Sequence, residues 1–156
     1  MTENLTMEEK ATNFETMRHI EMVRNLINGF VRELLSRGEL HDQSKLEHPE
    51  VESFAKYTSK LAAITYGSAE YETNLKEMEP ALMHHYAKNR HHPQHWKNGV
   101  DDMTLVDLVE LYLDWCAAAS RHNDGNILKS IEKNANKYSL SPQLVRILEN
   151  TAKQDS

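Results

Sequence analysis

Cysteine is nearly absent from this chain, which has only Cys116 among 156 residues. One cysteine cannot form an intramolecular disulfide, and such usage is typical of the reducing cytosol. No apolar run approaches the roughly 18 residues that a membrane span needs, and the acidic start, MTENLTMEEK, lacks the apolar core of a signal peptide. The sequence therefore predicts a soluble, cytoplasmic protein without a membrane partner.

Glycine and proline are also scarce, with five and four residues, so long stretches can run as helix without interruption. No segment alternates apolar and polar residues as a half-buried strand does. Positive charge is in deficit, because 18 basic residues face 24 acidic ones. A protein that wraps duplex nucleic acid needs a basic face, so we expect no duplex partner. A small phosphorylated ligand held by a few local cations is left open.

Apolar residues recur at helical spacing along most of the chain. The first segment covers residues 7–36, and Gly38 is a stop signal for it. Residues 66–72 read as a turn, and Pro80 is expected to kink or split the helix in which it lies. Further helices are predicted at residues 49–66, 70–89, 103–121, 126–136 and 142–152. The pattern predicts an all-α single domain of about six helices over residues 1–156, with its core at about 10–152.

The segment 103–121 combines an apolar surface with carboxylates. It is apolar around nearly its whole circumference, which is typical of a buried helix, yet Asp107, Glu110 and Asp114 share one stripe. Buried carboxylates are costly unless they are paired or bind a metal. Thr104 and Asp107 have the form of a capping box, which accounts for Asp107. Asp114 is therefore the favoured metal ligand, Asp107 is the alternative, and Glu110 could pair with a cation or orient a histidine.

Histidine is abundant, with nine residues, five of them in HHYAKNRHHPQHW at residues 84–96. Imidazole is the commonest protein ligand for transition metals. A lone histidine is more often a core or surface residue, and this reading is favoured for three of the nine, namely His48, His95 and His122. His84 and His85 point in different directions on a helix, so the choice between them stays open, with His85 preferred.

The order of the remaining histidines and aspartates resembles the HD-domain superfamily of metal-dependent phosphohydrolases. A helical histidine (His19), a His-Asp pair (His41–Asp42) and a final aspartate on a later helix match its pattern, and HDQSK at 41–45 is similar to its His-Asp-x-[Gly/Ser]-Lys stretch. The resemblance covers about residues 15–121 and implies an HD-like helical bundle. The chain also looks similar to short phage and bacterial HD-like proteins.

The intermediate histidines resemble the binuclear branch of that superfamily, which includes cyclic-nucleotide phosphodiesterases. The resemblance implies one divalent ion held by His19, His41, Asp42 and Asp114, and a second held by Asp42, His85, His91 and His92. The cofactor would be one or two ions of Mn, Fe, Co, Ni or Zn. The His-His pair is followed by PQHWKNG rather than by the Gly-Tyr-Pro segment of cyclic-di-GMP phosphodiesterases, so that substrate is not favoured.

The resemblance further implies hydrolysis of a nucleotide or other small phosphate ester by metal-activated water. Asp42 and Lys45 are the catalytic candidates, and Lys45 is expected to contact the phosphate, with an ordinary surface lysine as the alternative. Weaker phosphate-binding candidates are Arg90, Arg121 and Arg18.

Other functions are compatible with the same residues. The HD scaffold also hosts di-iron oxygenases, an all-α binding or inhibitor protein could retain a metal site, and a histidine-rich chain could buffer metal. Residues 138–148 could form a dimer surface or part of the core, so a homo-oligomer is left open.

Overall fold

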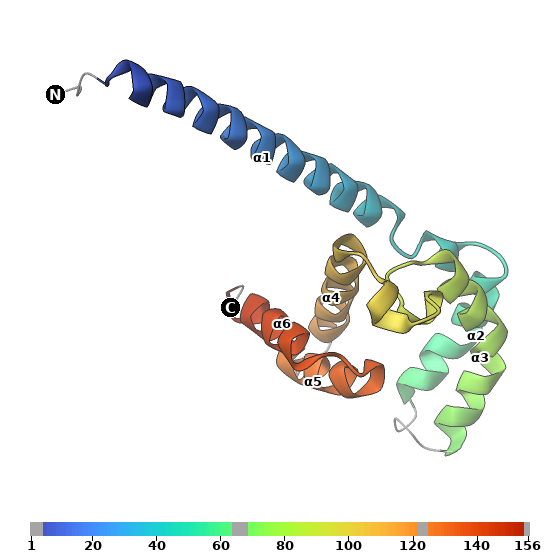
Figure 1. Cartoon of the computed structure of the whole chain (residues 1–156). Helices are drawn as coiled ribbons and strands as arrows, with labels where there is room; N and C mark the ends of the chain where they lie inside the picture. Colours follow the sequence, from blue (N-terminus) through green and yellow to red (C-terminus); the bar gives the residue numbers. More distant parts are fainter. Residues whose placement is uncertain (1–4, 64–68, 122–124, 155–156) are drawn as a thin grey trace. The chain divides into compact units, whose positions relative to one another are not determined.

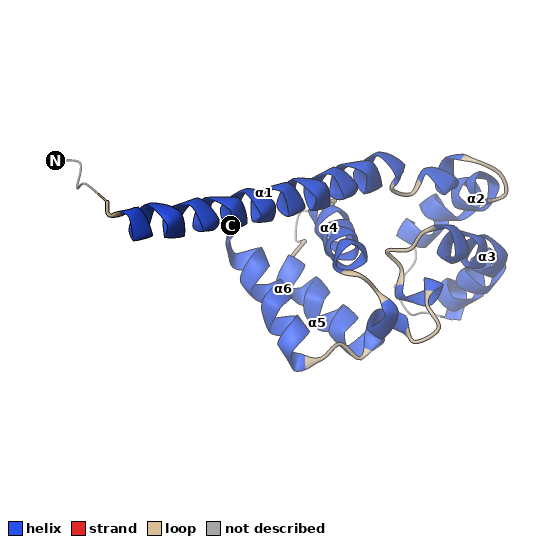
Figure 2. Cartoon of the chain, turned by 45° about the horizontal axis from the view of Figure 1, so that its top comes forward, coloured by secondary structure: helices blue, strands red, loops and turns tan. Residues whose placement is uncertain are grey.

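The secondary-structure elements in the described part of the chain are all helices. The computed structural model describes residues 5–63, 69–121 and 125–154, and these ranges contain six α-helices, three short 3-10 helices (η) and no strand (Figure 1, Figure 2). In chain order they are α1 (Met7–Leu40), η1 (Gln43–Leu46), α2 (Glu50–Ala63), α3 (Ala69–Lys88), η2 (Pro93–His95), η3 (Gly99–Asp102), α4 (Leu105–Ser120), α5 (Ile127–Tyr138) and α6 (Pro142–Gln154). The predicted all-α class and number of helices are confirmed.

Two compact units divide the chain, Met1–Glu39 and Leu40–Ser156. The helix of the first unit is α1, none of whose described residues is buried. All the other helices belong to the second unit. The expectation of a single domain stays a prediction. No helix in the described part of the chain is long and apolar enough to cross a membrane.

The first and third helices differ from the sequence expectations. The helix α1 continues past Gly38 to Leu40. The predicted turn at 66–72 is wrong from Ala69 onward, where α3 has already begun, and residues 64–68 lie outside the described ranges. Pro80 lies inside α3 without dividing it. Its side chain is exposed. Proline has no N–H to donate, so the carbonyl four residues earlier loses its helical hydrogen bond, and water can bond to that carbonyl on the exposed side.

The hydrophobic core of the second unit lies where α4, α5 and α6 meet. Trp115 of α4 stacks on Tyr138 of α5 with ring centroids 6.4 Å apart and the planes 2° from parallel. The core cluster consists of Leu111, Tyr112, Trp115, Ile131 and Ala152. Tyr138, Val145 and Leu148 pack against that cluster, which favours the core interpretation of residues 138–148. One face of α4 is thereby committed to the core.

Candidate metal centre

A tight turn after α1 presents the His-Asp pair. Asp42 has left-handed backbone angles (φ 55°, ψ 14°) and precedes η1. Aspartate is one of the few residues that adopt this conformation readily. The Nε2 of His41 lies 3.5 Å from the Oδ2 of Asp42. The turn therefore brings an imidazole nitrogen and a carboxylate oxygen of adjacent residues together.

Side chains from η1, α3, the segment after it and α4 converge on this pair. Among the described residues, three groups of donors have ligand atoms within 4.8 Å of one another, which is close enough to hold a metal ion. They are Asp42/His85/His91/His92, His41/Asp42/Asp114 and His41/His91/Glu110. Asp42 belongs to the first two groups, so its carboxylate lies between them. The fold thus brings together six of the seven predicted metal ligands.

In three of these histidines the ring nitrogen Nδ1 contacts a buried carboxylate. The Oε1 of Glu110 lies 2.9 Å from the Nδ1 of His41 and 3.0 Å from the Nδ1 of His91. The Oε2 of Glu50 lies 2.8 Å from the Nδ1 of His85. A carboxylate that accepts from Nδ1–H leaves Nε2 as the free donor, and such partners fix the ring of metal-ligating histidines. In all three residues Nε2 is therefore the atom available to a cation.

Two atoms at the middle of the first group have no hydrogen-bond partner. The Oδ1 of Asp42 and the Nε2 of His91 are both buried and unpaired, and they lie 3.5 Å apart. The Nε2 of His85 is 3.2 Å from the same Oδ1 and 2.8 Å from the Nε2 of His92. Buried polar atoms are rarely left unsatisfied. A cation ligated by these four atoms would satisfy them, so the residues fit a metal ion.

The protonation states of the candidate ligands differ. Burial lowers the pKa of His92 to about 3, and the neighbouring His91 and His85 add to this effect. His92 is therefore neutral at pH 7, as a ligand must be. Burial raises the pKa of Asp42, but the contacts with His85 and with Lys45 outweigh it and hold that pKa well below its usual range. Asp42 is therefore a carboxylate at neutral pH.

His41 behaves in the opposite way to His92. Its contacts with Asp114 and Glu110 raise the pKa of His41 to about 10, against the opposing effect of burial. The Nε2 of His41 lies 3.7 Å from the Oδ1 of Asp114. When no cation is bound, the imidazole is protonated at neutral pH and itself supplies the positive charge between the carboxylates.

Asp107 and Asp114 have separate roles in the structure. Asp107 is fully buried, accepts from the Oγ1 of Thr104 at 2.7 Å and completes a capping box at the start of α4. It also pairs with Arg90 at 3.3 Å. Asp114 instead belongs to the group with His41 and Asp42. Asp107 therefore serves the helix terminus, and Asp114 is the aspartate at the centre.

Glu50 is the site residue that sequence reasoning missed. It is the first residue of α2 and is fully buried. Its two oxygens contact His85 at 2.8 Å and the half-buried His84 at 2.7 Å, so His85 points into the centre and His84 stays outside it. Acidic residues are common in the first turn of a helix, so the sequence gives no signal that Glu50 contacts a histidine.

Of the predicted phosphate contacts, Lys45 touches one of the donor residues, Asp42. Its Nζ is 2.6 Å from the Oδ2 of Asp42 and 5.3 Å from the ring centroid of Phe54. Arg90 is engaged elsewhere, since its guanidinium pairs with Asp107 and lies 4.7 Å from the ring centroid of Trp96. Arg121 is exposed at the C-terminal end of α4.

Two predicted residues lie in the first unit. Arg18 pairs with Glu15 at 3.4 Å, and His19 is exposed on α1 and belongs to none of the three donor groups. The role of His19 as a ligand and that of Arg18 as a phosphate contact stay predictions.

Two of the histidines set aside in the sequence lie outside the three donor groups in the structure. His48 is exposed and pairs with Glu52 at 3.2 Å. The Nδ1 of His95 lies 2.8 Å from the carbonyl oxygen of Tyr86. His122 lies outside the described residues.

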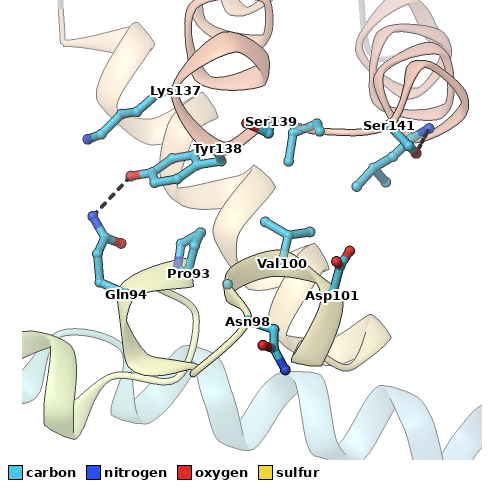
Figure 3. Close-up of a pocket in the computed structure, with 12 residues that line it drawn as sticks. Pro93, Gln94, Asn98, Val100, Asp101, Lys137, Tyr138, Ser139 and Ser141 are labelled. Carbon is cyan, nitrogen blue, oxygen red and sulfur yellow. Dashed lines mark hydrogen bonds between the residues drawn. The ribbon is translucent and has the colours of Figure 1, made fainter.

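A separate pocket of about 400 Å³ lies between the η2–η3 segment and the α5–α6 turn (Figure 3). Gln94 points across it and donates to the hydroxyl oxygen of Tyr138 at 3.4 Å (Figure 3). None of its lining residues belongs to the three donor groups. The pocket is therefore distinct from the candidate metal centre.

Comparison with known families places the chain in one of them. Residues 8–154 match the family described as "Family of unknown function (DUF5662)", and the chain belongs to this family. No curated protein and no solved structure shows significant similarity to the chain. The resemblance to the HD superfamily stays a prediction.

Proposed function

We propose that this DUF5662 protein is a metal-dependent phosphohydrolase that acts on a nucleotide or another small phosphate ester. The observation that carries the proposal is the position of Asp42. Its carboxylate is shared by a group that also contains three histidines and by a group that also contains His41 and Asp114. A carboxylate shared by two sets of donors would suit two neighbouring divalent ions.

The donor chemistry favours a transition metal. Imidazole suits Zn, Fe, Co, Ni and related ions, whereas Ca²⁺ and Mg²⁺ prefer sites built of oxygen donors. The group around His85, His91 and His92 offers three nitrogens and one oxygen. A divalent ion bound there would lower the pKa of a water molecule toward neutrality and polarise a phosphoryl oxygen.

The exposure of the ligands supports access from one side. His85 and His91 are at most 2% exposed, whereas His41 and Asp114 are 30% and 29% exposed. A phosphate ester would therefore approach from the side of His41 and Asp114. Lys45, also on an accessible side at 36% exposure, would offer its ammonium group to a non-bridging phosphate oxygen.

The experiment is elemental analysis of the full chain, purified without an affinity tag, followed by hydrolysis assays on a panel of nucleotides and simple phosphate esters. We expect one or two equivalents of a transition metal and phosphate release from at least one substrate. Asp42→Asn should lose both the metal and the activity while keeping its helical circular dichroism. Asp101→Asn, a substitution at an exposed aspartate, is the matched control and should keep both.

Other outcomes would replace the proposal. If no metal is present and none is taken up from Mn, Fe or Zn solutions, there is no metal centre. If bound iron consumes oxygen and no phosphate is released, the protein is a di-iron oxygenase. If bound metal supports neither activity, the protein is a metal-containing binding protein.

Lys45 allows a sharper test of phosphate binding. Lys45→Met keeps the approximate length of the side chain but removes its charge, and with it the cation–π contact with Phe54. We expect unchanged metal content and a loss of about tenfold or more in kcat/KM, because a charged hydrogen bond to phosphate is lost. Unchanged kinetics would assign Lys45 to the protein surface.

A further inference from the structure

The helix α1 has no packing partner within its own unit. It is 34 residues long and none of its side chains is buried. Ile20, Val23, Ile27 and Leu35 are 39–66% exposed. In proteins most of the stability of a helix comes from packing an amphipathic face, not from intrinsic propensity. The apolar face of α1 therefore needs a partner surface.

The spacing on that face is that of a helix pair. Ile20, Val23, Ile27, Phe30 and Leu34 follow one another at intervals of three, four, three and four residues, which is the heptad pattern of helices that pack along their length. Met17, Val31 and Leu35 widen the same stripe on one side. Arg18, Asn25 and Ser36 lie on the opposite face, as the helical repeat of 3.6 residues requires.

Charge is distributed unevenly between the two ends of the helix. Residues 7–23 carry four acidic and two basic side chains, and residues 24–40 carry two acidic and three basic ones. Two copies of α1 placed in opposite directions would set the acidic half of each beside the basic half of the other. Parallel copies would place the acidic halves beside each other and the basic halves beside each other, and this repulsion is unfavourable. The helix dipoles also favour the antiparallel arrangement.

From the stripe and this charge asymmetry, we propose that α1 pairs with α1 of a second copy of the chain, in antiparallel orientation, to form a homodimer. In a dimer with a two-fold axis, both copies use the same surface, so one apolar stripe on α1 is enough to form the interface. When the two helices overlap fully, the axis passes near Val23 and Arg24 and sets Ile20 of one copy beside Ile27 of the other. The inference concerns α1 alone and does not depend on the metal centre.

The first test is the mass of the full chain in solution, by light scattering over a range of concentrations. The wild type should be a dimer. Ile20→Glu/Ile27→Glu should raise the dissociation constant of the dimer by about 100-fold or more, because charges would be buried without partners. Asn25→Glu/Ser36→Glu adds the same charge to the opposite face and should leave the dimer intact. A monomeric wild type, or a stripe variant that stays dimeric, would overturn the proposal.

The second test measures orientation with spin labels in the Cys116→Ser background. A label at Arg24→Cys, near the axis, should lie close to its counterpart. Labels at Thr12→Cys should be about 35 Å or more apart, since position 12 would face position 35 at 1.5 Å per residue. Short distances at both positions would mean parallel helices and would contradict the antiparallel pair. Docking of α1 on the second unit would appear as a monomer and would also refute it.

Discussion

The Nδ1 of His85 lies 2.8 Å from the Oε2 of Glu50, and neither side chain is more than 2% exposed. A buried carboxylate is costly unless cations and hydrogen bonds compensate it. Glu50 has such compensation, since Ser44 donates to it at 3.0 Å and His84 contacts its other oxygen. These contacts outweigh burial and hold the pKa of Glu50 below its usual value. The pair fixes the ring of His85 with Nε2 toward Asp42.

Glu50→Gln should weaken metal binding, although Glu50 is not itself a ligand. Partners that orient a metal-ligating histidine are typically worth 10- to 100-fold in affinity, and we expect a loss of about that size. Calorimetric titration of the metal-free chain with Zn²⁺ or Mn²⁺ measures it. Glu52→Gln, at an exposed position on the same helix, is the control. Equal affinities in the two variants would exclude an orienting role for Glu50.

Single substitutions should separate the two groups of donors. His92→Gln alters only the group of Asp42, His85, His91 and His92, and Asp114→Asn alters only the group of His41 and Asp42. If the wild type holds two ions, each variant should hold about one, because each retains one intact group, while Asp42→Asn should hold none. Elemental analysis gives the stoichiometry. Two full equivalents in Asp42→Asn would contradict a shared carboxylate.

Metal binding at pH 7 should release a proton from His41. The pKa of His41 is raised to about 10, so the free imidazole is protonated at pH 7, and a metal ion on Nε2 must displace that proton. Affinity should therefore rise with pH between 7 and about 10. Calorimetry in buffers of different ionisation enthalpy counts the protons released.

The matched variants distinguish His41 from His92. His41→Gln should release about one proton fewer than the wild type on binding the metal. His92→Gln should release the same number, because burial already keeps His92 neutral by lowering its pKa to about 3. An equal loss of protons in both variants would show that the released proton does not come from His41.

Asp107→Asn should destabilise the protein without changing its metal content. The variant weakens the capping box at Thr104 and the pair with Arg90, and a polar group left unsatisfied at the buried position 107 costs about 1–3 kcal/mol. Thr104→Ala should cost about 1 kcal/mol, as for other N-caps. Urea unfolding of the metal-free chain gives both values. Metal loss in Asp107→Asn with full retention in Asp114→Asn would reverse the two assignments.

Much of the local structure could be predicted from neighbouring residues. Ser141 and Pro142 predicted the start of the helix at 142–154. In the structure the Ser141 hydroxyl accepts a hydrogen bond from the backbone N–H of Leu144 at 3.2 Å. The capping box at Thr104 could also be predicted, because both of its partners lie within one helical turn. The turn predicted at 66–72 extended too far, because Gly67 and its polar neighbours are typical of a turn.

The set of candidate ligands was also named from the order of histidines and aspartates, yet its geometry could not be. His84 and His85 are adjacent and chemically identical, so only the packing of α3 against η1 and α2 decides which faces Asp42. Glu110 was recognised as a residue that could orient a histidine, but that it serves both His41 and His91 follows from the position of α4.

The sequence by itself determined that the chain is helical, where most helices begin and end, and which residue types are available to bind a metal. These properties depend on contacts within about one helical turn. Tertiary structure alone decided that Asp42 stands between two donor groups and that Glu50 is buried against His85. Asp42 and Glu50 meet His85 across 43 and 35 residues of chain, a separation that no local pattern encodes, because burial and convergence are set by how whole helices pack.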